Sequence, residues 1–79
     1  MNTFNDLKSS YAMLIQSALI LGASRDTLKH GNEILHHSCR QIVDGSAFDQ
    51  QVKQQMKNEL DQLKNLLDFE IEGHFTNHS

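Results

Sequence analysis

The segment at 11–21, YAMLIQSALIL, constrains this chain most, because it is apolar on nearly every side of a helix. At about 100° per residue, Met13 and Ile20 fall on one flank of this helix and Ile15 and Leu19 fall on the other. A helix of this kind has to be surrounded by other elements rather than laid on a surface. The segment has about half of the ~20 residues that a membrane span needs, so we expect a buried helix and no membrane contact.

Glycines and capping residues divide the chain into helices. There is no proline, and three of the four glycines, Gly22, Gly45 and Gly73, stand where helix ends are expected. Ser24 and Ser46 follow the first two of these glycines as candidate N-caps. No stretch alternates with period two, so strands are not expected. We predict three helices with tight turns, at about 4–21, 25–44 and 47–72, followed by a disordered tail at 74–79.

The predicted fold class is all-α, a single helical domain at 1–73 that forms an antiparallel bundle or a helical hairpin plus a third helix. Only 38 % of the 79 residues are hydrophobic, and a chain this short buries only roughly 60 % of its unfolded surface. We therefore expect a second copy of the chain or a protein partner to complete the core. The first helix carries a heptad seam made of Phe4, Leu7, Tyr11, Leu14, Ala18 and Leu21.

Gly31 lies in the middle of the second predicted helix, where glycine costs about 1 kcal/mol relative to alanine. A neighbouring helix that approaches closely at this position would explain it. A kink, or a helix that begins only at Asn32, would explain it equally well.

The net charge indicates which classes of partner to expect, and the cysteine content indicates which cellular compartment. The formal net charge is −3 and the seven Lys and Arg residues are scattered, whereas nucleic-acid binders concentrate basic side chains on one surface. We therefore expect no nucleic-acid partner. Cys39 is the only cysteine and forms no intramolecular disulfide, which favours a reducing compartment and hence the cytoplasm. The first ten residues lack the features of a signal peptide.

Two chemical patterns provide alternative functions. Glu33, His36 and His37 form a Glu-x-x-His pattern typical of metal-binding bundles, although a complete site needs more ligands. The third predicted helix is acidic, since residues 46–73 hold six acidic and three basic residues and end near Glu70 and Glu72. It is the basis of a second alternative, an inhibitor that presents this helix to a basic site.

The first hypothesis is a small non-enzymatic protein–protein interaction module that acts by helix packing. The sequence has no nucleophile elbow and no glycine-rich phosphate loop, so neither an enzyme nor a cofactor is expected. In size and helical plan the chain resembles small bacterial co-chaperones, adaptors and regulators that bind one partner, although no motif residue carries this resemblance. The predicted interaction surface, for a homo-oligomer or a protein partner, consists of Met13, Ile15, Leu19, Ile20, Leu66 and Phe69.

Overall fold

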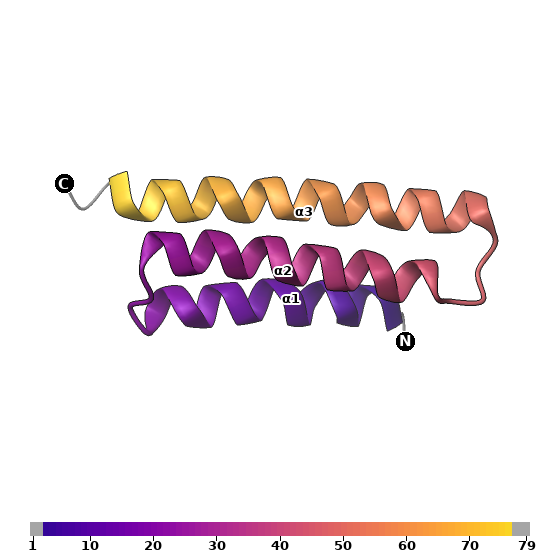
Figure 1. The fold of residues 1–79 in the computed structure, drawn as a ribbon, viewed down its shortest axis with the longest axis horizontal. Coiled ribbons are helices and arrows are strands. Elements are labelled where there is room, and N and C mark those ends of the chain that lie inside the picture. Colours follow the sequence, from indigo (N-terminus) through magenta and orange to yellow (C-terminus); the bar gives the residue numbers. More distant parts are fainter. Residues whose placement is uncertain (1–2, 77–79) are drawn as a thin grey trace.

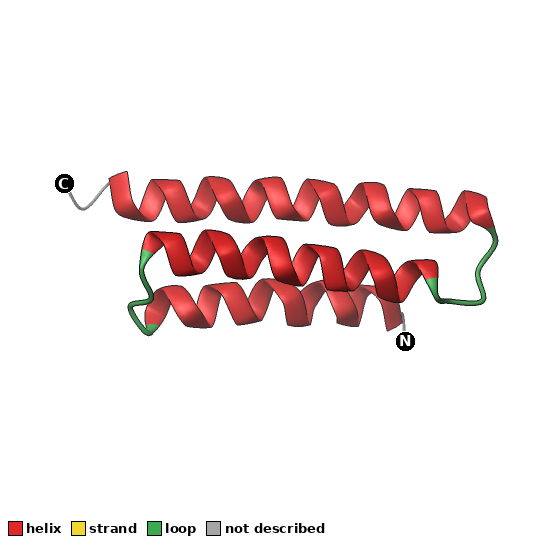
Figure 2. Cartoon of the chain, viewed as in Figure 1, coloured by secondary structure: helices red, strands yellow, loops and turns green. Residues whose placement is uncertain are grey.

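The computed structural model describes residues 3–76, and within them the regular structure consists of three helices (Figure 2). Figure 1 shows these helices side by side, with α1 and α3 running in the same direction and α2 running against both. The molecule is an elongated rod with principal extents of 46 × 19 × 17 Å. The predicted all-α class and the antiparallel bundle are therefore confirmed. The helices are α1 (Thr3–Ile20), α2 (Arg25–Asp44) and α3 (Gln50–Thr76).

The first turn is built as the sequence predicts. The backbone N–H of Thr27 donates to the Ser24 hydroxyl at 3.2 Å, which makes Ser24 the N-cap of α2. Gly22 has a φ of +88°, a left-handed conformation that a side chain would strain. The short turn thereby brings α2 back along α1.

The second turn differs from the prediction, because α3 begins at Gln50 and not at residue 47. Asp49 is its N-cap, since its carboxylate accepts from the backbone N–H of Val52 at 2.9 Å. The hydroxyl of Ser46 instead donates to the carbonyl oxygen of Val43 at 2.7 Å. Ser46 therefore closes the end of α2, and residues 45–49 form a longer connection than expected.

Neither Gly73 nor Gly31 interrupts a helix. The prediction that Gly73 ends the third helix is wrong, because α3 continues to Thr76 and includes the first three residues of the predicted tail. Positions 77–79 lie outside the described residues. Two of the explanations offered for Gly31 are also wrong: α2 begins at Arg25 and not at Asn32, and no neighbouring helix approaches closely, since a Cβ built at Gly31 meets nothing within 4 Å.

Gly73→Ala is expected to stabilise the protein by about 0.5–1 kcal/mol, because alanine is the better residue inside a helix. A Cβ at this position meets no atom within 4 Å. Urea denaturation of the variant measures the change in the free energy of unfolding. Gly22→Ala is the control and should lower this free energy, because Gly22 has a positive φ. A loss of stability in Gly73→Ala would mean that Gly73 is a left-handed helix end after all.

The core lies along the middle of the rod, and α1 turns most of the predicted seam toward it: Tyr11 is buried, and Phe4, Leu7 and Ala18 pack against the core. Leu14 and Leu21 of the seam are nevertheless 57 % and 85 % exposed, whereas Ile15 is buried. The reason is that a seven-residue repeat drifts by about 20° per repeat around a straight α-helix, so the seam turns away from the core toward the end of α1. The buried apolar residues are Tyr11, Ile15, Leu28, Cys39, Val43, Leu60, Leu67 and Ile71.

One buried polar network joins all three helices at the centre of the rod. Asn32 of α2 is 0 % exposed, and the Tyr11 hydroxyl of α1 lies against both its side-chain and its backbone carbonyl oxygen. The Asn32 side-chain amide donates to the Asp68 carboxylate at 2.8 Å and to the Lys64 carbonyl oxygen at 3.1 Å, both on α3. Burial, assisted by Cys39 and Asp68, raises the pKa of Tyr11 well above its usual range, so its hydroxyl stays a donor. These directional contacts fix how far each helix is turned about its own axis.

Candidate interaction surface

Among the residues that the structure describes, the ion pairs between helices lie in the two seams that α3 makes with its neighbours. Within residues 3–76, every ion pair between two helices has one partner on α3, and no ion pair joins α1 to α2. The α1–α3 seam holds Lys8–Glu59 at 2.9 Å. The α2–α3 seam holds Arg25–Glu72, Lys29–Glu72, His36–Asp61, Arg40–Asp61 and Lys57–Asp44, at 2.6–3.2 Å.

Three carboxyl groups of α3, those of Asp61, Asp68 and Glu72, have lowered pKa values because of the groups that hydrogen-bond to them. Burial of Asp68 acts to raise its pKa, but hydrogen bonds from Asn32 and Lys64 outweigh it and hold the pKa below its usual range. The pKa of Glu72 is lowered by its hydrogen bonds from Arg25 and Lys29. These carboxylates are therefore largely neutralised within the chain itself.

Acid is expected to destabilise the bundle. A group whose pKa is lower in the folded state stabilises that state above its unfolded pKa, about 3.9 for Asp and 4.3 for Glu, and loses this contribution as the pH falls through the folded pKa. The urea midpoint should accordingly decline from about pH 5 downward. Asp68→Asn should make the decline shallower, whereas Glu33→Gln, at an exposed position of α2, should leave it unchanged. Equal declines in all three proteins would contradict this assignment.

Six exposed apolar side chains, four on the side of the bundle formed by α1 and α2 and two on the adjoining outer edge of α1, make up what we call the uncharged face. On α1, the residues that line the α3 seam include Lys8 and Ala12, and at about 100° per residue Leu14 and Leu21 point away from that seam, toward α2. On α2, Arg40 marks the α3 seam, and Ile34 and Ile42 point away from it by the same measure. The uncharged face consists of Met13, Leu14, Ile20, Leu21, Ile34 and Ile42, which are 51–86 % exposed.

The uncharged face extends along most of α1 and α2. Residues 9–24 contain no Asp, Glu, Lys, Arg or His, and only small polar residues stand between the apolar ones. The pair Met13–Leu14 recurs after seven residues as Ile20–Leu21, a spacing typical of a helix that packs against another helix. At 1.5 Å per residue, Leu14 lies about 9 Å before the end of α1 and Ile34 about 14 Å after the start of α2, so the two residues are within about 5 Å of the same level along the rod. Asp6 borders the face at the start of α1.

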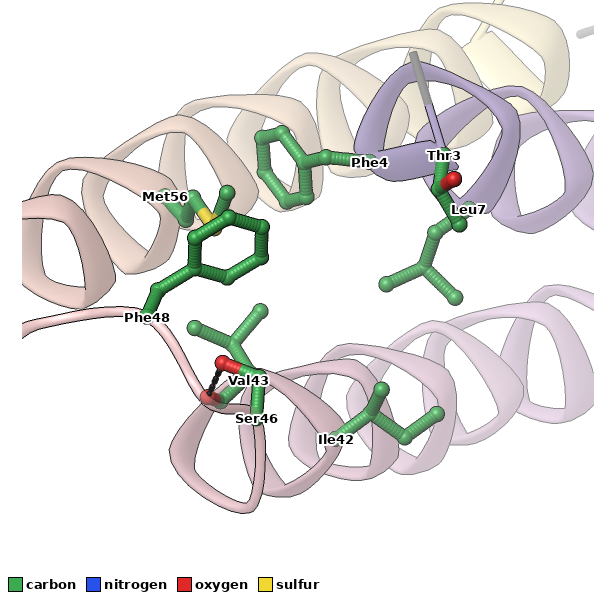
Figure 3. Close-up of a pocket in the computed structure, with 8 residues that line it drawn as sticks. All are labelled: Thr3, Phe4, Leu7, Ile42, Val43, Ser46, Phe48 and Met56. Carbon is green, nitrogen blue, oxygen red and sulfur yellow. Dashed lines mark hydrogen bonds between the residues drawn. The ribbon is translucent and has the colours of Figure 1, made fainter. Parts of the chain in front are cut away.

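At one end, the uncharged face opens into an apolar groove of about 680 Å³. Figure 3 shows Phe4 and Leu7 of α1 facing Ile42 and Val43 of α2 across this groove, with Phe48 and Met56 closing one end. The remaining lining residues are Thr3 and Ser46, so among the described residues no titratable side chain lines the groove. Its shape suits aliphatic or aromatic groups.

The structure separates the residues of the predicted interaction surface. Met13 and Ile20 are exposed, but Ile15 is 3 % exposed and belongs to the core, and Leu19 packs against that core. Leu66 and Phe69 are 62 % and 78 % exposed but lie on α3, away from the uncharged face. Including Ile15 was therefore wrong. The exposed large apolar residues that the predicted surface omitted are Leu14, Leu21, Ile34, Ile42 and Phe48.

The geometry does not support either alternative function. Within residues 3–76, no three His, Cys, Asp or Glu side chains converge to hold a metal ion, and His36 is bound to Asp61 at 2.6 Å. Glu33 and His37 are exposed. Of the two acidic residues that an inhibitor would present to its target, Glu72 is paired with Arg25 at 2.6 Å, whereas Glu70 is exposed, so this alternative stays a prediction.

These features define the class of protein: a three-helix bundle with charged seams on two sides and an unpartnered apolar face on the third. No protein-family model, curated protein or solved structure matches the chain. Within the described residues, α1, α2 and α3 all lack the length and hydropathy required to cross a membrane.

Proposed function

We propose that this protein is a non-enzymatic interaction module that binds another polypeptide helix through the uncharged face. One observation carries the proposal: six large apolar side chains stay 51–86 % exposed on the one side of the bundle that lacks ion pairs. Interface cores are depleted in charged residues in the same way. Its role would be that of a regulator, adaptor or co-chaperone, in a reducing compartment such as the cytoplasm, where the single cysteine, Cys39, stays a thiol.

The energy available on the uncharged face is sufficient for binding. Burying one such side chain completely is worth roughly 1.5–3 kcal/mol. At the observed exposures the six residues together offer about 6–12 kcal/mol, before the partner's own contribution. Association costs about 4–15 kcal/mol, so a partner with a comparable apolar face would form a stable complex. The groove supports the same function, because its lining offers apolar contacts without a catalytic acid or base.

Photo-cross-linking in cells that make the protein tests this proposal. A benzophenone amino acid is placed at Met13, on the uncharged face, or at Gln62, an exposed position on α3, as the control. We expect an adduct with a polypeptide from Met13 and little or none from Gln62. Equal yields at both positions, or no adduct at Met13, would contradict the function.

A further inference from the structure

We propose that the occupant of the uncharged face is a second copy of this chain, related by a two-fold axis that crosses the helices at the level of Leu14 and Ile34. The inference rests on the proposed function and names its partner. A two-fold interface uses the same patch twice, so the patch has to complement itself. The uncharged face meets this condition, because it brings no like charges together where two copies meet.

The size of the face agrees with this partner. A specific interface needs about 1,000 Å² in total, or about 500 Å² on each partner. The 18 residues of α1 span about 27 Å and the rod is 19 Å wide, so the side on which the uncharged face lies offers an area of that order. The charged seams of α3 lie on the other sides of the rod. The net charge of −3 on each copy is therefore held away from the contact.

The protruding and the recessed parts of the uncharged face determine whether two copies pair in parallel or antiparallel. Ile20 and Leu21, 86 % and 85 % exposed, protrude at one end, and the groove lined by Leu7 and Ile42 is recessed at the other. At 1.5 Å per residue, Leu21 and Leu7 each lie about 10 Å from Leu14, on opposite sides. An axis across the helices at Leu14 therefore sets Ile20 and Leu21 of each copy into the groove of the other.

Parallel pairing fits less well. It would place the protruding residues of both copies at the same end and leave the two grooves facing each other without an occupant. It would also bring Asp6 of one copy close to Asp6 of the other. Antiparallel pairing places Asp6 near the uncharged turn at 21–24 instead.

The mass in solution is the first test. Light scattering at micromolar concentration should give twice the 9.0 kDa of the chain. Ile20→Asp should weaken self-association at least roughly thirtyfold, as expected for an apolar contact buried in the partner's groove, and Phe69→Asp on the outer side of α3 should leave it unchanged. A monomeric wild type overturns the inference, and so does a dimer that only Phe69→Asp dissociates. If the protein is a monomer but still cross-links to a different protein through Met13, the inference that the partner is a second copy is wrong. The proposed function then still holds.

Cysteine cross-linking tests the direction. In a Cys39→Ala background, Leu14→Cys alone should form a covalent dimer, because Leu14 of the two copies meet at the axis. Leu21→Cys alone should form no covalent dimer, but a mixture of Leu21→Cys and Ile42→Cys proteins should form one. Cross-linking of Leu21→Cys to itself in place of the mixture overturns the antiparallel arrangement. Circular dichroism of each variant checks that the helices remain, and the wild-type mass does not depend on any variant.

Discussion

Ile15→Asp is expected to unfold the protein, whereas Ile20→Asp leaves the fold of each chain intact. Ile15 is 3 % exposed and Ile20 is 86 % exposed, although both belong to the same apolar stretch of α1. A carboxylate at Ile15 removes about 1.5–3 kcal/mol of apolar burial and adds several kcal/mol for a buried unpaired charge. A chain of this length has only roughly 4–12 kcal/mol of stability in total, so Ile15→Asp should exhaust it.

Circular dichroism and urea denaturation measure this difference. The two variants differ only in position, so their comparison removes any general effect of a charge on helix α1. Loss of helix in both variants would mean that the uncharged face is part of the folding core. If Ile15→Asp folds, α1 does not turn Ile15 toward the core.

Asn32→Ala is expected to cost about 3–5 kcal/mol. It leaves the Tyr11 hydroxyl without its acceptor side chain and removes the amide that donates to Asp68 at 2.8 Å. Each hydrogen bond lost costs about 0.5–1.5 kcal/mol, or about 1.5–3 kcal/mol where one partner is charged, and the shortened side chain leaves a small cavity. The fully buried position of Asn32 leaves little room for water to replace these bonds.

The urea midpoint of Asn32→Ala should therefore fall far below that of the wild type. Glu33→Ala, the exposed neighbour on the same helix, is the control and should change stability little. Tyr11→Phe should lose only part of the same energy, since Asp68 keeps its amide donor. If Asn32→Ala and Glu33→Ala unfold at the same urea concentration, the network contributes nothing to stability.

The helices were predictable because their signals are local. Ser24 caps α2 as expected, and α2 has the predicted bounds of Arg25–Asp44. The errors occurred where two local signals competed. Ser46 and Asp49 are both acceptable caps, and the carboxylate of Asp49 binds the first turn of α3 while Ser46 closes α2. Gly73 resembles a helix end in the sequence, but the pairing of Glu72 with Arg25 and Lys29 holds this part of α3 against α2.

The interaction surface was less predictable than the helices, because it depends on how α1 is turned. In an all-round apolar helix the pattern indicates several equally suitable inward sides, and so Ile15 was assigned to the exposed face and Leu14 to the core seam. The deciding contact is made by Tyr11 with Asn32, which are 21 positions apart. No local pattern predicts that pairing. The contributions of Ile34 and Ile42 likewise become visible only when α2 lies beside α1.

The confinement of ion pairs to the seams of α3 makes this molecule respond to ionic strength in two opposite ways. Salt screens partly exposed pairs such as Lys8–Glu59 and Arg40–Asp61, and thereby loosens the attachment of α3. Sulfate and phosphate strengthen apolar burial, and they act mainly on the opposite side, where α1 and α2 carry no ion pair between them. A strongly salted solution should therefore favour the association of whole bundles while weakening the contacts inside each one.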